Sequence, residues 1–107
     1  MDKTMDTSLI TSPSFYPIRP DAKGLIGFGA CLFAGRLSLN GIAIYTRPDG
    51  SGIRCLFPSK ILPNGKELHI YYPVDTPTYN MIAEAMEEKI NDVGKMRKNY
   101  GQYYSNI

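Results

Sequence analysis

The 107-residue sequence has no tryptophan, one histidine and two cysteines, and these shortages exclude several kinds of chemistry. The one histidine, His69, stands between Leu68 and Ile70 without a second histidine or a cysteine pair nearby. Because a structural zinc ion needs three or four converging ligands, we expect no metal site and an exposed His69 on a strand. A nucleophilic triad would also need this imidazole, and no serine or cysteine lies in the sharp turn typical of such a nucleophile. We therefore predict that the protein is not an enzyme and uses no cofactor.

The two cysteines, Cys31 and Cys55, both lie in apolar stretches. Free cysteine is among the most buried residue types, so we expect two buried, reduced thiols. A disulfide is the alternative, but nothing else in the sequence indicates an oxidising compartment.

Long hydrophobic runs are also lacking. The longest mainly apolar stretch, residues 24–35, is 12 residues long, whereas a membrane-spanning helix needs roughly 20. The first 20 residues contain two aspartates and three prolines and lack the apolar core of a signal peptide. Gly27-Phe-Gly29-Ala-Cys-Leu32 is not a phosphate-binding loop, because it lacks the third glycine of that pattern and no helix is expected to follow it. We expect a cytoplasmic protein with neither a membrane partner nor a small-molecule substrate.

Acidic and basic residues nearly balance, with a formal net charge of +2, but they are unevenly distributed. Residues 19–66 hold seven basic residues and two acidic ones, whereas residues 75–93 hold five acidic residues and one lysine. The last 14 residues add three basic residues and no acidic one. Such a chain can present a basic surface to a polyanion, although solvation alone often produces similar mixtures.

Proline and glycine divide the chain into short strands. We expect a loose polar leader over residues 1–14 and, over residues 15–20, an edge strand at most, because its prolines cannot donate to a ladder. Period-two alternation predicts strands over residues 25–33, 37–46, 53–57 and 67–72. Gly27 and Gly29 share one face of the first of these, which indicates strong bending or the close approach of another backbone. A loop over residues 58–65 closes with an Asn-Gly turn, and connections this short force antiparallel neighbours in a meander.

One amphipathic helix should follow the strands. Thr76 is the expected N-cap, Pro77 suits the first helical position, and Gly94 is the expected stop. Between them an apolar stripe recurs at helical spacing: Ile82, Met86, Ile90 and Val93. The predicted fold is α+β, an antiparallel sheet of about four to five strands followed by one C-terminal helix. We expect a single domain over residues 15–94 and a basic, tyrosine-containing tail over residues 95–107.

The loop after the fourth predicted strand is bracketed by prolines and presents Ser59, Lys60 and Lys66. Hydroxyl and ammonium groups of this kind commonly contact phosphates. Taken alone, the segment is explained more simply as a tight connector that orders two strands.

The same segment resembles the SpoVG family, the bacterial septation and sporulation regulators. Members of that family carry Pro-Ser-Lys after a strand and Pro-Asp/Asn-Gly before the next, then an aromatic residue or histidine followed by Pro-Ile/Val-Asn/Asp leading into a helix. The matching residues here are Pro58-Ser59-Lys60, Pro63-Asn64-Gly65 and Tyr72-Pro73-Val74-Asp75, and Ile82 and Ala85 fall on apolar positions of the family's helix. The resemblance covers about residues 15–93 and is specific over residues 52–86. It implies a small dimeric α+β domain that binds DNA or RNA as a regulator and has no enzymatic activity.

The start of the helix departs from the family's pattern. Familiar members often have basic residues in its first turns, which are thought to take part in nucleic-acid recognition, whereas this chain has Tyr79 and Met81 there. An aromatic ring at Tyr79 would stack on a base, which favours single strands over duplex, and the basic tail would supply phosphate contacts. The candidate nucleic-acid-binding residues are Arg47, Arg54, Ser59, Lys60, Lys66, Tyr79, Lys95, Arg97 and Lys98.

The alternative function is a protein-interaction module, carried for example by a phage or another mobile element and directed at a host protein. The two functions differ in salt dependence, because phosphate binding releases counterions and an apolar interface does not. We also expect a homodimer, since a short meander leaves exposed edge strands and has only one helix to cover two faces. The resemblance to the SpoVG family points the same way.

Overall fold

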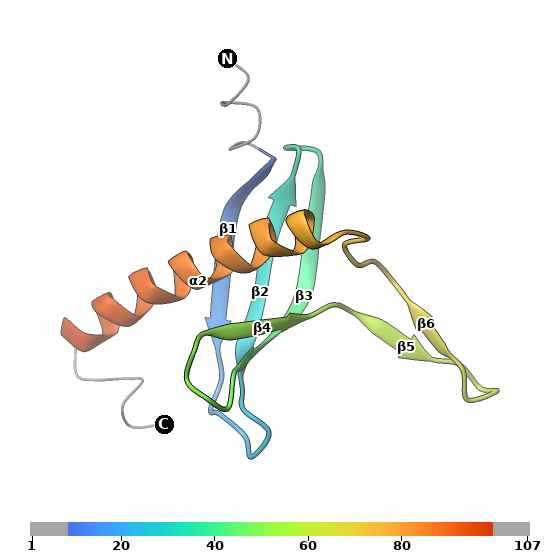
Figure 1. Cartoon of the computed structure of the whole chain (residues 1–107), viewed down its shortest axis with the longest axis horizontal. Helices are drawn as coiled ribbons and strands as arrows, with labels where there is room; N and C mark the ends of the chain where they lie inside the picture. The colour runs from blue at the N-terminus through green and yellow to red at the C-terminus, as the bar shows by residue number, and fades with distance from the viewer. Residues whose placement is uncertain (1–8, 100–107) are drawn as a thin grey trace.

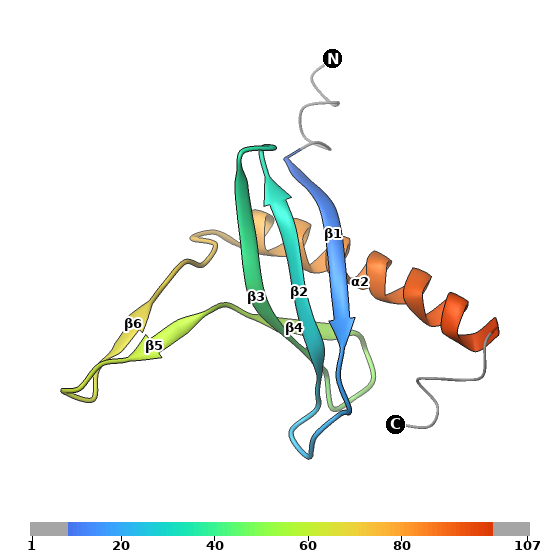
Figure 2. The same cartoon turned by 180° about the vertical axis from the view of Figure 1, so that it is seen from behind.

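The computed structural model describes the backbone of residues 9–99 and the side-chain surroundings of residues 9–92. Four strands form an antiparallel sheet in the order β1-β2-β3-β4, and two shorter strands form a separate sheet, β5-β6. The bounds are β1 Ile10–Pro17, β2 Leu25–Phe33, β3 Leu37–Thr46, β4 Ile53–Leu56, β5 Ser59–Ile61, β6 Glu67–His69 and α2 Thr76–Asn99. The helix α2 lies across one face of the four-stranded sheet and leaves the other face uncovered (Figure 1 and Figure 2). The predicted α+β fold, an antiparallel meander with one C-terminal helix, is confirmed.

The central strands β2 and β3 have the bounds that the alternation predicts. Residues 34–36 connect them through a β-turn, whose central residues Ala34 and Gly35 both have positive φ, at 54° and 66°. The Arg36 N–H donates to the Phe33 carbonyl across it at 3.0 Å. Turns with positive φ at both central residues match the twist of a hairpin, so this turn favours antiparallel pairing of β2 with β3.

The first strand is longer than the sequence indicates. β1 begins at Ile10, so residues 10–14 belong to the sheet and not to the expected leader; residues 1–8 lie outside the described part of the chain. The register with β2 shifts between Thr11 and Ser14, and Ser12 has a φ of 52°. This bulge lifts Pro13 out of the ladder, where its missing N–H does no harm.

The loop predicted over residues 58–65 is in fact half of a hairpin. β5 pairs with β6, with Ser59 opposite His69 and Ile61 opposite Glu67. A β-turn over residues 62–65 joins them, with the Gly65 N–H donating to the Leu62 carbonyl at 2.8 Å. The prediction was wrong because both prolines of the segment lie just outside the three-residue strand. We call residues 58–70 the arm; it projects from the four-stranded sheet and does not extend it (Figure 1).

The helix differs from its prediction at both ends. Its N-cap is Asp75 and not Thr76, since the Thr78 N–H donates to Asp75 Oδ1 at 2.8 Å. It continues through Gly94 to Asn99. A glycine inside a helix costs only about 1 kcal/mol relative to alanine, and the residues after Gly94 are mostly good helix formers, so the helix continues.

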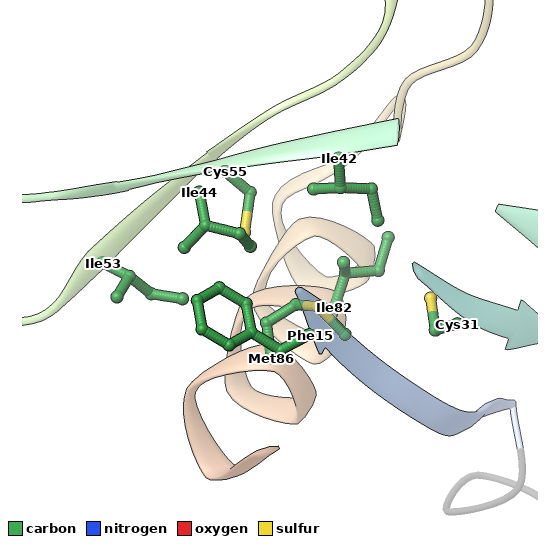
Figure 3. Close-up of a cluster of buried hydrophobic side chains, with 8 residues drawn as sticks. All are labelled: Phe15, Cys31, Ile42, Ile44, Ile53, Cys55, Ile82 and Met86. Carbon is green, nitrogen blue, oxygen red and sulfur yellow. The ribbon is translucent and has the colours of Figure 1, made fainter. Parts of the chain in front are cut away.

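Eight buried side chains from the sheet and the helix form one core (Figure 3), namely Phe15, Cys31, Ile42, Ile44, Ile53, Cys55, Ile82 and Met86. The predicted helix stripe is confirmed at Ile82 and Met86, and Ile90 is half-buried against this core. Val93 lies outside the residues whose side chains are described. A fully buried residue such as Ile44 stabilises the fold by roughly 1.5–3 kcal/mol.

Both cysteines are buried free thiols, as expected. Burial raises the pKa of Cys55 to about 11 and also raises the pKa of Cys31. Both side chains therefore serve as apolar core residues at neutral pH.

The core lies on the glycine face of β2. A Cβ at Gly27 would lie 2.5 Å from the Tyr16 carbonyl oxygen and 2.7 Å from Cε1 of Phe15. A Cβ at Gly29 would overlap Sδ of Met86. The predicted close approach is therefore that of β1 beside β2 and of α2 above it. Phe28, which lies between the two glycines, is on the uncovered face.

Candidate nucleic-acid interface

The arm presents its two lysines on one face. Lys60 pairs with Leu68 across the hairpin, and directly paired residues of an antiparallel ladder project to the same side. Lys66 is two residues before Leu68, and alternate residues of an extended chain share a face. Both lysines are exposed. The arm therefore holds two ammonium groups on one side of a narrow ribbon.

Ser59, also expected at the site, lies on the opposite face of the arm. Its hydroxyl donates to Glu67 Oε2 at 2.6 Å, and its cross-strand partner is His69. His69 Nε2 lies 4.0 Å from Glu67 Oε1, and all three side chains are exposed. A carboxylate beside the hydroxyl is unfavourable for phosphate, so the structure groups the two lysines without Ser59.

The two predicted arginines lie at the other end of β4 from the arm. Arg54 is on β4, and Arg47 opens the β3–β4 turn, in which its N–H donates to the Gly52 carbonyl at 2.9 Å. The guanidinium of Arg54 lies 5.1 Å from the centre of the Tyr45 ring. Arg54 belongs to the uncovered face, because its neighbours Ile53 and Cys55 point into the core. Arg47 is exposed and lies in the turn, just beyond the end of β3.

Tyr79 is not free to stack on a base. It is half-buried against the core, and its hydroxyl oxygen accepts the Cys55 N–H at 3.0 Å. Its ring meets Phe57 edge-on, with the ring centres 6.1 Å apart. In this structure Tyr79 joins α2 to β4.

Three predicted residues, Lys95, Arg97 and Lys98, fall in the last turns of α2. Their side chains lie outside the described residues. The end of α2 points away from the arm (Figure 1). In a single chain, the basic segment at the end of α2 and the basic arm therefore do not form one surface.

Acidic residues occupy the outer side of the helix. Glu84, Glu88 and Asp92 are exposed and recur every four residues along α2. Each is two residues after Ile82, Met86 or Ile90, which pack in or against the core, so the three carboxylates lie on the opposite side of the helix. The predicted basic residues whose side chains are described are thus divided between the arm and the β3–β4 end. The carboxylate of Glu87, another acidic residue of α2, lies beside Gly52 in the β3–β4 turn.

Exposed aromatic residues on the uncovered sheet face were not anticipated. Tyr16 pairs with Phe28, Phe28 with Ala43, and Ala43 with Leu56, so these four residues form a row across all four strands. The exposed fraction is 67% for Tyr16 and 40% for Phe28. The glycines of β2 were the available signal: if the glycine face receives the helix, the face with the large side chains must be the open one.

Within residues 9–92, side chains of histidine, cysteine, aspartate and glutamate do not gather in threes in a way that would hold a metal ion. Across the described part of the chain, the helix lacks the length of apolar sequence needed to cross a membrane. In comparisons with known proteins, no family model and no curated protein matches the sequence. The resemblance to the SpoVG family stays a prediction that rests on the residues quoted for it.

Proposed function

We propose that this protein is a non-enzymatic nucleic-acid-binding regulator of the SpoVG type that acts in the cytoplasm as a homodimer. The observation that carries the proposal is the placement of Lys60 and Lys66 on one face of a projecting two-stranded arm. Ammonium groups held in this way neutralise phosphates, and a two-stranded ribbon is narrow enough to enter a major groove or to follow a single strand.

The distribution of charge supports the same function. The acidic stripe of α2 would repel a polyanion, but the arm projects away from the helix (Figure 1). The β3–β4 turn lies closer to an acidic residue, because the Glu87 carboxylate is beside Gly52. A nucleic acid that approaches these two regions meets Lys60, Lys66, Arg54 and Arg47. A second copy would double the number of basic groups presented.

The homodimer is supported by the exposed apolar residues of the arm and of the segment after it. Ile61 is 66% exposed and Val74 85% exposed. An isolated two-stranded hairpin is only marginally stable in water, so packing against a second copy would stabilise the arm.

Fluorescence anisotropy with labelled single-stranded and duplex DNA and RNA tests the proposal. Affinity should fall steeply between about 50 and 200 mM salt, because binding releases counterions. Replacing one phosphate-contacting lysine should reduce the slope of log K against log salt by roughly 0.7–0.9. We expect this reduced slope for Lys60→Ala and for Lys66→Ala. Lys23 is an exposed lysine of the β1–β2 connection, and Lys23→Ala should leave the slope unchanged.

Two outcomes would change the proposal. If neither lysine variant alters binding but joint replacement of Lys95, Arg97 and Lys98 by glutamine abolishes it, the end of α2 is the site. If the wild-type protein binds no DNA or RNA at about 50 mM salt, the electrostatic mechanism is wrong.

The second candidate function is a protein-interaction module, for example of a phage or another mobile element. It is favoured by the exposed apolar residues of the arm and the segment after it, Ile61, Ile70, Tyr72 and Val74, because exposed apolar surface can mark a protein interface. A partner held in this way would remain bound at high salt.

A further inference from the structure

We infer that the uncovered face of the four-stranded sheet stacks the bases of a single-stranded nucleic acid. The stacking residues are Phe28 and Tyr45, with Tyr16 beside them and Arg54 as the cation. This inference rests on the proposed nucleic-acid function and names its substrate class.

The geometry of the face suits extended bases. β2 and β3 are the two central strands, and Phe28 on β2 pairs with Ala43 on β3. Tyr45 is two residues beyond Ala43, so it is the diagonal neighbour of Phe28 on the same face, at a separation of roughly 7–8 Å. Tyr16 adds a third ring on the edge strand, directly opposite Phe28. Aromatic residues on adjacent strands of an open four-stranded sheet are a known way to stack two or three successive bases.

Small side chains leave room for the bases. Ala43 stands between Phe28 and Leu56 in the row across the sheet, and Ala30 follows Phe28 on the same face of β2. The helix covers the opposite face (Figure 2). On the uncovered face Tyr16 and Phe28 are exposed, and the Arg54 guanidinium lies over the Tyr45 ring, 5.1 Å from its centre. A duplex hides its base faces in the stack, whereas a single strand can place them on the sheet.

Electrostatics favours a polyanion over a second copy at this face. Arg54 is the only charged residue within the bounds of β1, β2, β3 and β4. Two copies packed through this face would bring together two guanidinium groups with no carboxylate from the strands to pair with them. A nucleic acid supplies a phosphate for each. The Arg54 guanidinium already lies over the Tyr45 ring, where its plane can also stack on a base.

Conservative variants separate stacking from charge. Tyr16→Leu and Phe28→Leu keep an apolar side chain and remove the ring, and both positions are exposed, so the fold should persist. We expect each to weaken binding to labelled oligodeoxythymidylate by roughly five- to 150-fold, with much smaller effects on a dT·dA duplex. Tyr72→Leu is the matched control, because Tyr72 is an exposed aromatic residue outside the sheet. Arg54→Lys should also weaken binding, since it keeps the charge and loses the planar group.

Photocrosslinking of the wild-type protein to oligodeoxythymidylate gives an independent measurement that needs no variant. The crosslinked tryptic peptide should be residues 24–36, which contains Phe28. Crosslinks confined to the arm would overturn the inference and leave the proposed function standing.

The remaining outcomes also distinguish the two proposals. Unchanged affinity in the aromatic variants, with loss in Lys60→Ala and Lys66→Ala, would overturn stacking alone. Absence of binding to any nucleic acid would overturn both proposals. If Phe28→Leu converts a dimer to a monomer in light scattering but binds oligodeoxythymidylate normally, the face belongs to a second copy and the inference is wrong.

Discussion

Met86 on α2 occupies the space that a side chain at Gly29 on β2 would need, since a Cβ at Gly29 would overlap the Met86 sulfur. Met86 is fully buried, so it has little freedom to move aside. The absence of a side chain at this one position of β2 therefore determines how closely the helix approaches the sheet. Phe28, the residue before Gly29, consequently faces away from the helix and is exposed.

Gly29→Ala should destabilise the protein by about 1–3 kcal/mol, the usual cost of overpacking a core. The backbone at Gly29 is not in the left-handed region, so the cost is steric. Urea unfolding should show a lower midpoint with little change in slope. In the Met86→Ala background, itself destabilised by about 2–5 kcal/mol, Gly29→Ala should cost less, because the opposing sulfur is gone. Equal costs in the two backgrounds would contradict this contact.

The Asp75 cap should make the helix sensitive to acid. Hydrogen bonds from the Thr78 hydroxyl and N–H lower the pKa of Asp75 below its usual 3.8. A lowered pKa gives stability that is present above the unfolded-state value and is lost as pH falls through the folded-state value. Asp75→Asn keeps an acceptor without this titration, so the wild type should lose more stability than the variant below about pH 4. Urea midpoints measured at neutral and acid pH check this; parallel losses would show that the cap carboxylate does not contribute.

The central hairpin and the helix stripe were predictable because their signals are local. Most residues of β2 and β3 alternate between the two faces, although the register shifts twice, and Ile82 and Met86 recur at the spacing of a helix. The arm was not predictable in the same way, since three-residue strands between prolines carry too short a pattern. The extension of α2 beyond Gly94 depends on the helix formers that follow it, and a glycine alone does not reveal this.

The candidate site was predictable only in composition. Lys60 and Lys66 share a face because of how β5 pairs with β6. The sequence predicts a loop at β5, and a loop gives no strand pairing from which a shared face could be inferred. Tyr79 matches a functional position in sequence, but its hydroxyl accepts the Cys55 N–H from 24 residues away. The uncovered face with Tyr16 and Phe28 depends on which side of β2 receives the helix, and that is decided by a contact between distant parts of the chain.

Tyr71 should make the protein sensitive to alkali. Its hydroxyl donates to the Asn40 carbonyl at 2.7 Å, and burial raises the pKa of Tyr71 to about 12, with a smaller contribution from Cys31. A raised pKa gives stability that is complete below the unfolded-state value near 10 and is lost as pH rises through about 12. Tyr71→Phe should cost roughly 0.5–1.5 kcal/mol at neutral pH and lose less stability than the wild type above pH 10. The difference in urea midpoint between the two proteins should narrow as pH rises. A constant difference would show that the ionisation of Tyr71 does not cause the loss of stability.

The protein should be a homodimer in which the arm is packed against a second copy. The arm has only three-residue strands, and Ile61 on it and Val74 after it are among the most exposed apolar residues described. Light scattering at tens of micromolar protein should give about twice the chain mass of 11.9 kDa. Ile61→Asp combined with Val74→Asp should give the monomer, because a carboxylate buried in an apolar interface without a partner is strongly unfavourable. Leu37→Asp is the matched control: Leu37 is also exposed, but it lies at the β2–β3 turn, away from the arm (Figure 1), so this variant should remain dimeric. A wild-type mass of one chain would rule out the dimer, and a dimer that survives the arm substitutions would place the interface elsewhere on the molecule.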